Sequence, residues 1–126
     1  MLKKTILFLY TALITLLSIL PPSDIPKINV IPYIDKWVHL AMYAGLSFLW
    51  LWAWKEKTNH YKYWIIFLIV LGWGSLMEII QGITHLGRNF ETADILADVL
   101  GFLPGWFAWK IFQNSYAHRI FKSPNH

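Results

Sequence analysis

The chain has 126 residues, of which 56% are hydrophobic and only 14% are charged, with a formal net charge of +4. Soluble domains carry roughly 25% charged residues, and a core of this size could not hide so much apolar surface, so a disordered chain and an ordinary soluble domain are excluded. The absence of cysteine excludes disulfides, thiolate nucleophiles and cysteine-type zinc sites. The basic residues lie in short clusters without a nucleic-acid-binding motif, so no nucleic-acid partner is expected.

Four apolar runs follow one another along the chain, each close to the roughly 20 residues that a helix needs to cross a bilayer. The first run ends in Pro21-Pro22 without a small-residue cleavage site, which favours a retained helix over a signal peptide. We therefore predict one all-α domain, an integral membrane four-helix bundle, with helices over about residues 2–20, 37–54, 63–84 and 95–112. The polar residues 114–126 are expected to form a loose tail.

Basic residues are distributed unevenly over the predicted loops. Eight of the eleven lie at the N-terminal end of the first apolar run, between the second and third helices, or in the final part of the chain from Lys110 onward. The other two connections contain only Lys27, Lys36 and Arg88. The positive-inside rule therefore predicts a multi-pass membrane protein with both termini in the cytoplasm. The aromatic residues between Trp50 and Trp64 are expected to anchor the cytoplasmic interface.

Ionisable and amide side chains recur at helical spacing in the outer halves of the last three predicted helices. They form one stripe on each helix, at spacings of three, four or eight residues: Asp35, His39 and Tyr43; Glu78 and Gln81; Asp94 and Asp98. Such residues are costly in lipid and normally face a bundle interior or a wet cavity, so the stripes predict a polar pocket on the outer side. Gly101 and Gly105 allow close approach of another helix, within the chain or between copies in an oligomer.

The chemistry of these side chains suggests their roles in the pocket. Buried imidazole and carboxyl groups suit general acid–base catalysis, which we expect of His39, Glu78 and Asp98. Ligand binding is expected of the residues around them: Asp35, Lys36, Tyr43, Gln81, Arg88 and Asp94. Asp94 and Asp98 are spaced to share a divalent cation, but no complete ligand set is visible, so no metal ligand is assigned and the cofactor stays open.

Most of these residues also have a structural interpretation. The set comprises two helix N-terminal residues (Asp35 and Asp94), a snorkelling lysine (Lys36), interhelical hydrogen-bonding groups (His39 and Gln81) and a buried ring (Tyr43). His85 and Glu91 are expected near the surface, in solvent. Glu78 and Asp98 are hardest to explain in this way, because a carboxyl group inside a membrane helix needs a partner.

The order and spacing of these residues resemble the VanZ-like family of small bacterial membrane proteins. The motifs are Asp35-Lys36-x-x-His39-x-x-x-Tyr43, Glu78-x-x-Gln81, Arg88 and Asp94-x-x-x-Asp98-x-x-Gly101, and the resemblance covers roughly Pro32 to Gly105. It departs at Asp98, where the family often has Asn, so this chain carries an extra negative charge there. The resemblance implies a multi-helix protein of the bacterial cytoplasmic membrane, in a family named for a member linked to resistance to the glycopeptide teicoplanin.

Two functions from different classes fit this pattern. An outward pocket suits binding or modification of a cell-envelope lipid, such as a polyprenyl-linked precursor, or of a lipoglycopeptide. Lys36, Arg88 and protonated His39 would then meet a phosphate or carboxylate. The alternative is a structural or partner-assisting protein whose polar residues form a buried packing network. In either case membrane lipids are the expected partners, and the absence of internal repeats disfavours a transporter.

Overall fold

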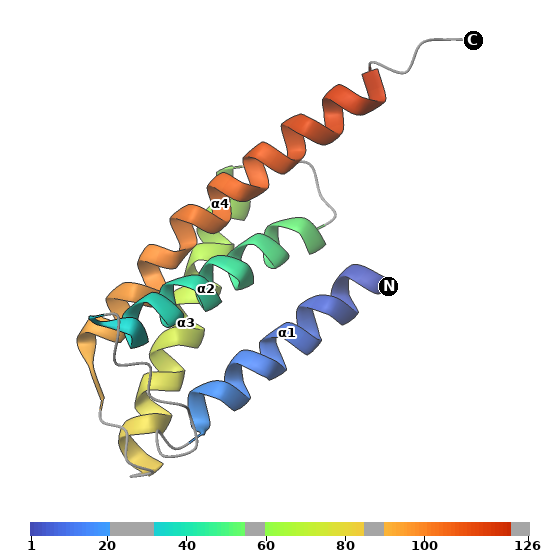
Figure 1. Ribbon diagram of the computed structural model, residues 1–126. Helices are drawn as coiled ribbons and strands as arrows, with labels where there is room; N and C mark the ends of the chain where they lie inside the picture. Colours follow the sequence, from blue (N-terminus) through green and yellow to red (C-terminus); the bar gives the residue numbers. More distant parts are fainter. Residues whose placement is uncertain (21–31, 55–59, 85–89, 122–126) are drawn as a thin grey trace.

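The computed structural model describes residues 1–20, 32–54, 60–84 and 90–121, and its regular structure within these residues is entirely α-helical. The four helices are α1 (Leu2–Ile19), α2 (Ile34–Ala53), α3 (His60–Thr84) and α4 (Thr92–Phe121) (Figure 1). The predicted all-α architecture of four helices is therefore confirmed.

Three of the helices are long and apolar enough to cross a membrane: α1, α3 and the part of α4 from Thr92 to Ser115. Most residues of these spans are not buried inside the chain, which leaves them available to lipid. The protein is therefore a membrane protein. α2 falls outside this set although it has 20 residues, because its sequence includes Asp35, Lys36 and several tryptophans.

Several helix boundaries differ from the predicted ranges. α2 begins at Ile34, three residues before its predicted start, and α3 begins at His60 rather than at residue 63. α4 continues to Phe121, so the prediction of a loose tail is wrong for residues 114–121. No glycine or proline lies between Gly105 and Phe121 to end the helix. The predicted span ended where the hydropathy declines, but a decline in hydropathy does not by itself end a helix.

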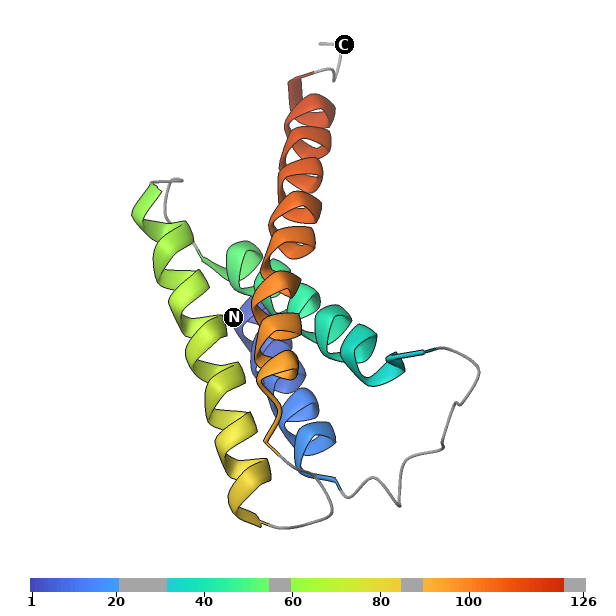
Figure 2. The ribbon, with the colours of Figure 1, turned by 90° about the vertical axis from the view of Figure 1, so that its left-hand side faces the viewer.

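The helices alternate in direction along the chain. The Lys3 ammonium donates to the Trp52 carbonyl oxygen at 3.4 Å, which places the start of α1 beside the end of α2. Lys110 lies 5.3 Å from the centre of the Tyr63 ring, which places the second half of α4 beside the start of α3. α2 and α4 run in the same direction and form the most extensive helix contact. Figure 2 shows α4 in front, with α3 on one side and α2 on the other.

Two glycines allow the close contact between α2 and α4. A Cβ atom added at Gly101 would lie 2.7 Å from the Leu40 carbonyl oxygen and 3.0 Å from the Tyr43 Cβ. A Cβ atom at Gly105 would clash with the Ala44 carbonyl oxygen. The small-xxx-small spacing of these glycines therefore serves a contact within the chain, as such spacing does in other membrane helix pairs.

The core lies between all four helices and is rich in aromatic residues. α1 contributes Leu7 and Ile14, and the other buried core residues belong to α2, α3 and α4. Its largest fully buried apolar side chains on these helices are Tyr43, Leu46, Leu51, Ile66 and Val70. The aromatic residues predicted at the cytoplasmic interface divide into two groups. Tyr61 and Trp64 are exposed, as an interfacial anchor requires, whereas the others pack against the core: Trp50, Trp52, Trp54 and Tyr63.

Candidate functional site

The polar stripes of α2, α3 and α4 meet at one end of the bundle, where α2 and α4 begin and α3 approaches its end. Two adjacent groups of side chains occupy this end. We name them the inner cluster, which consists of His39, Glu78 and Asp98, and the outer cluster, which consists of Asp35, Lys36, Glu91 and Asp94. The predicted meeting of the three stripes is thus found in the structure.

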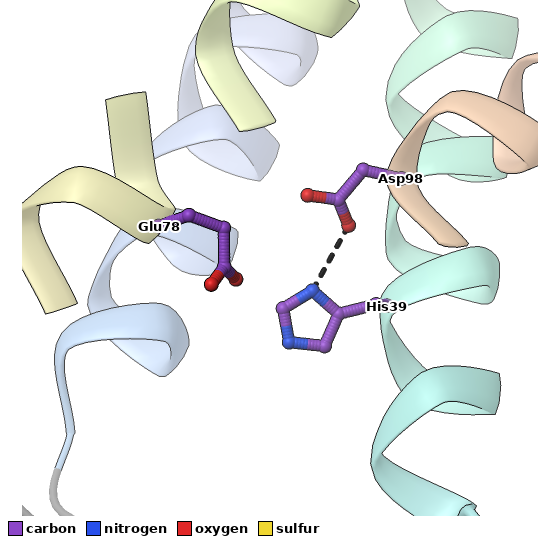
Figure 3. Close-up of side chains that lie close together, drawn as sticks. All are labelled: His39, Glu78 and Asp98. Atoms are coloured by element: carbon purple, nitrogen blue, oxygen red, sulfur yellow. Dashed lines mark hydrogen bonds and ion pairs between the residues drawn. The ribbon is translucent and has the colours of Figure 1, made fainter. Parts of the chain in front are cut away.

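The inner cluster is almost completely buried. The exposed fractions of His39, Glu78 and Asp98 are 5%, 0% and 1%. The Nδ1 atom of His39 lies 2.9 Å from Asp98 Oδ1, at hydrogen-bonding distance. Figure 3 shows the Glu78 carboxyl group facing the imidazole ring and the Asp98 carboxyl group across the space between the helices. One ligand atom from each of the three residues lies within 4.8 Å of the others.

Each carboxyl group of the inner cluster uses only one of its oxygen atoms in the described contacts. Glu78 Oε2 accepts a hydrogen bond of 3.2 Å from the backbone N–H of Glu91, whereas Glu78 Oε1 is buried without a hydrogen-bond partner. Asp98 Oδ1 faces His39, whereas Oδ2 is buried without a hydrogen-bond partner. Gly74 of α3 makes room for this second oxygen, because a Cβ atom there would lie 2.6 Å from Asp98 Oδ2.

The outer cluster is built around one ammonium group. Lys36 Nζ lies 2.7 Å from Asp35 Oδ2, 2.5 Å from Glu91 Oε2 and 2.6 Å from Asp94 Oδ1. The ammonium donates hydrogen bonds to Asp35 Oδ2 and Glu91 Oε2, whereas its contact with Asp94 is an ion pair. Asp35 and Asp94 occupy the first turns of α2 and α4, where the helix dipole stabilises negative charge, in agreement with their structural interpretation.

The remaining predicted site residues lie apart from these clusters or outside the described residues. Gln81 is buried, and its Nε2 donates to the Ser18 carbonyl oxygen at 2.7 Å, which ties α3 to α1. Tyr43 belongs to the core, one turn beyond His39. Arg88 and His85 fall outside the residues that the structure describes.

Glu91 is the site residue that the sequence analysis missed. Its side chain is 54% exposed, as expected, yet it forms an ion pair with Lys36, and its backbone N–H binds the Glu78 carboxylate. It lies three residues before Asp94 and continues the stripe of α4 back by one turn. This spacing was a usable signal, but α4 was predicted to begin only at residue 95.

An apolar groove of about 410 Å³ lies between α1 and α3. Its walls consist of Phe8, Thr11, Ala12, Thr15, Leu16, Ile19 and Trp73. The two threonine hydroxyl groups donate to carbonyl oxygens of their own helix at 2.8 and 2.7 Å, so they do not need a polar partner in the groove. The groove extends to Ile19, next to the hydrogen bond between Ser18 and Gln81.

Comparison with protein families places these features in a known group. A model of the VanZ/LLP1 family matches residues 3–113, which include both clusters and the groove. The chain belongs to the VanZ/LLP1 family. The resemblance inferred from the sequence motifs is therefore confirmed. Comparisons with curated proteins and with solved structures give no significant match.

The charge of this VanZ/LLP1 site limits what it can bind directly. Its described residues include five carboxyl groups, one lysine and one histidine. Because Lys36 is already surrounded by three carboxylates, it is poorly suited to meet an anionic ligand alone. The inner cluster instead offers an imidazole held by a carboxylate beside a second carboxyl group, an arrangement suited to proton transfer or to cation binding.

Proposed function

We propose that this protein binds a lipid-linked molecule of the cell envelope at the outer face of the bacterial cytoplasmic membrane. The lipid chain would lie in the groove between α1 and α3, and the head group would reach the inner cluster. The observation that carries this proposal is the position of a buried polar cluster at the end of the bundle toward which an apolar groove extends.

The groove has the properties that an alkyl or polyprenyl chain requires. Phe8, Leu16 and Ile19 expose apolar surface on a helix long enough to span a membrane, so the groove is open to lipid. Each buried methylene group contributes about 0.8 kcal/mol to binding. A chain that fills the groove therefore gains affinity without any specific polar contact.

The inner cluster has the properties that chemistry on a head group requires. The Asp98 carboxylate fixes the orientation of the His39 ring, and Glu78 supplies a second proton-transfer group nearby. The substrate classes that fit are polyprenyl-linked wall precursors and lipoglycopeptides such as teicoplanin, which combine an apolar chain with a polar head. General acid–base catalysis by these three residues is the enzymatic form of the proposal.

The distribution of basic residues supports the proposed position at the outer face. Lys3, Lys62 and Lys110 lie at the end of the bundle opposite to the clusters. By the positive-inside rule that end belongs in the cytoplasm, together with both termini, and the clusters then face outward.

A purely structural function is the second candidate, and specific contacts favour it. The ion pairs of Lys36 join α2 to α4, and the hydrogen bond from Gln81 to Ser18 joins α3 to α1. In this form of the proposal the polar network holds the bundle together for a partner protein. It predicts no bound lipid of a particular class and no dependence on the groove.

Lipid retention separates the two candidates. The wild-type protein and two variants are extracted in native membrane discs, and their retained lipids are compared by mass spectrometry. Ala12→Phe fills the groove from an exposed position, whereas Ala108→Phe places the same ring at an exposed position of α4 outside the groove. We expect about tenfold lower retention of one lipid class in Ala12→Phe, because excluding two methylene groups costs about 1.6 kcal/mol.

The Ala108→Phe variant should match the wild type in both lipid profile and thermal stability. A fourth sample, Glu78→Gln, tests the head-group contact, and it should retain less of the same lipid class than the wild type. Identical lipid profiles in all four samples would exclude the lipid proposal and leave the structural candidate.

A further inference from the structure

We propose that His39, Glu78 and Asp98 bind a divalent transition-metal cation, with Zn²⁺ as the representative ion. This assignment goes beyond the proposed lipid function and rests on the inner cluster alone.

The three side chains of the inner cluster lie close enough together to bind one metal ion after small side-chain rotations. One ligand atom from each residue lies within 4.8 Å of the other two, and the three residues come from three different helices. In a tetrahedral zinc site with bonds of about 2.1 Å, neighbouring ligand atoms are about 3.4 Å apart. Rotations of the Glu78 and Asp98 side chains would close this difference without moving the helices.

Two carboxyl oxygen atoms of the inner cluster lack a hydrogen-bond partner, and a bound cation would take the place of that partner. Glu78 Oε1 and Asp98 Oδ2 are buried without hydrogen bonds, on side chains that are 0% and 1% exposed. Buried polar atoms in folded proteins are nearly always satisfied, and carboxylate oxygens are satisfied by donors or by metal ions. The missing partner therefore lies between α3 and α4, beside the imidazole ring (Figure 3).

The donor set and its charge indicate the class of metal. Two ionised carboxylates and a neutral imidazole carry two negative charges, which a divalent cation balances. An imidazole nitrogen favours Zn²⁺ or Fe²⁺ over Ca²⁺, which prefers oxygen ligands alone. Asp35, Glu91 and Asp94 also lie within reach of one another, but the Lys36 ammonium already occupies the space between them.

A cation held by three protein ligands would also offer an open coordination position to an oxygen of a phosphate head group. Lys36 is poorly suited to bind this phosphate, because three carboxylates already surround it. This link to phosphate rests on the proposed lipid function, whereas metal binding itself does not. Metal binding is therefore measured on lipid-depleted protein, so that the two proposals can fail separately.

The test measures zinc binding by the full chain in detergent after treatment with a chelator. Isothermal titration calorimetry and elemental mass spectrometry give the affinity and the number of Zn²⁺ ions per chain. We expect one ion per chain in the wild type. We expect Asp98→Asn and Glu78→Gln to bind at least about tenfold more weakly, a loss that even an outer-shell partner of a metal site can cause.

Two variants serve as matched controls. Asp35→Asn removes the same charge as Asp98→Asn but from an exposed position of the outer cluster. His60→Gln removes an exposed histidine at the opposite end of the bundle. Both controls should bind zinc as the wild type does. Circular dichroism checks that each variant retains the helical content of the wild type.

X-ray absorption at the zinc edge of the wild-type complex provides a measurement that depends on no variant. We expect one imidazole nitrogen and carboxylate oxygens at about 2.0–2.2 Å. The proposal is overturned if the wild type binds no zinc or if the spectrum lacks the imidazole. It is equally overturned if Asp98→Asn and Glu78→Gln bind normally, or if Asp35→Asn abolishes binding to the same extent as Asp98→Asn.

Discussion

The two ends of the bundle surround their lysines in different ways. At the end with the clusters, Lys36 is held by three carboxylates. At the opposite end, which we name the basic end, Lys3, Lys62 and Lys110 lie 5.0, 5.8 and 5.3 Å from the centres of aromatic rings. All five carboxyl groups of the described residues lie at the cluster end.

The lysines that bear on membrane orientation and the carboxyl groups that suit chemistry therefore lie at opposite ends of the bundle. A cation over an aromatic ring is stabilised without losing its positive charge, so the basic end can hold lysines in a Trp-rich region and still follow the positive-inside rule. At the cluster end the carboxyl groups of Glu78 and Asp98 are buried and close together, where they can bind a cation or move a proton. The proposed acid–base chemistry and metal binding therefore belong to the cluster end.

The largest effect is expected from separating α2 and α4 next to the cluster end. In Gly101→Ala the new Cβ would lie 2.7 Å from the Leu40 carbonyl oxygen, and backbone atoms cannot move away as a flexible side chain can. We expect the free energy of unfolding to fall by about 3 kcal/mol, as for other overpacked sites. Denaturation in mixed micelles, followed by circular dichroism, measures this change.

Gly72→Ala is the matched control on α3. A Cβ atom at Gly72 meets no atom within 4 Å, so the same methyl group should cause no loss of stability and, through its higher helix propensity, can add up to about 1 kcal/mol. Equal losses in the two variants would show that helix flexibility, rather than the contact with α2, explains the role of Gly101.

Much of this arrangement could be predicted from spacing within single helices. Helical periodicity placed His39 one turn after Asp35 and Asp98 one turn after Asp94, and hydropathy found all four helices. Such rules describe one helix at a time. They predicted three polar faces that meet, but not which atoms would meet.

The pairing of residues between helices could not be predicted, because it depends on how the helices are aligned. Asp98 faces His39 from 59 positions away along the chain, at an alignment set by the contact of Gly101 with α2. The same alignment brings Glu91 to Lys36, so a residue expected in solvent became part of the outer cluster. Gln81 was predicted in the pocket but faces α1, whose position relative to α3 no spacing rule gives.

An intermediate loss of stability is expected when one lysine is replaced at either end of the bundle. Lys36→Gln leaves three carboxylates close together without their ammonium, and the Lys36 side chain is only 21% exposed. Because Asp35 and Glu91 are partly exposed to solvent, we expect a moderate loss of about 1 kcal/mol in the free energy of unfolding. Lys110→Gln removes only contacts with the Tyr63 and Trp106 rings, worth about 0.5 kcal/mol.

Salt concentration distinguishes the two kinds of contact. Raising the ionic strength to about 1 M shortens the screening length to about 3 Å and should reduce the cost of Lys36→Gln. The cost of Lys110→Gln should change less, because its ring contacts involve no opposite formal charge. If Lys110→Gln proves the more costly variant at low salt, the cluster end does not depend on its ion pairs.

The smallest change in stability is expected for two cysteine variants that test which end of the bundle faces outward. The chain has no cysteine, so a single introduced thiol is the only one that a maleimide can label. His60 and Thr92 are the first residues of α3 and α4, are both exposed, and lie at opposite ends of the bundle. Thr92→Cys and His60→Cys should therefore fold with almost unchanged stability.

The labelling pattern then decides the orientation. In right-side-out spheroplasts, a membrane-impermeant maleimide should label Thr92→Cys and should label His60→Cys only after permeabilisation. The reverse pattern would place the cluster end in the cytoplasm. An outer-leaflet head group would then be out of reach, whereas zinc binding by the inner cluster would be unaffected. The labelling experiment therefore tests the lipid proposal, which requires the cluster end to face outward. It does not test the metal proposal, which depends only on the distances among three side chains.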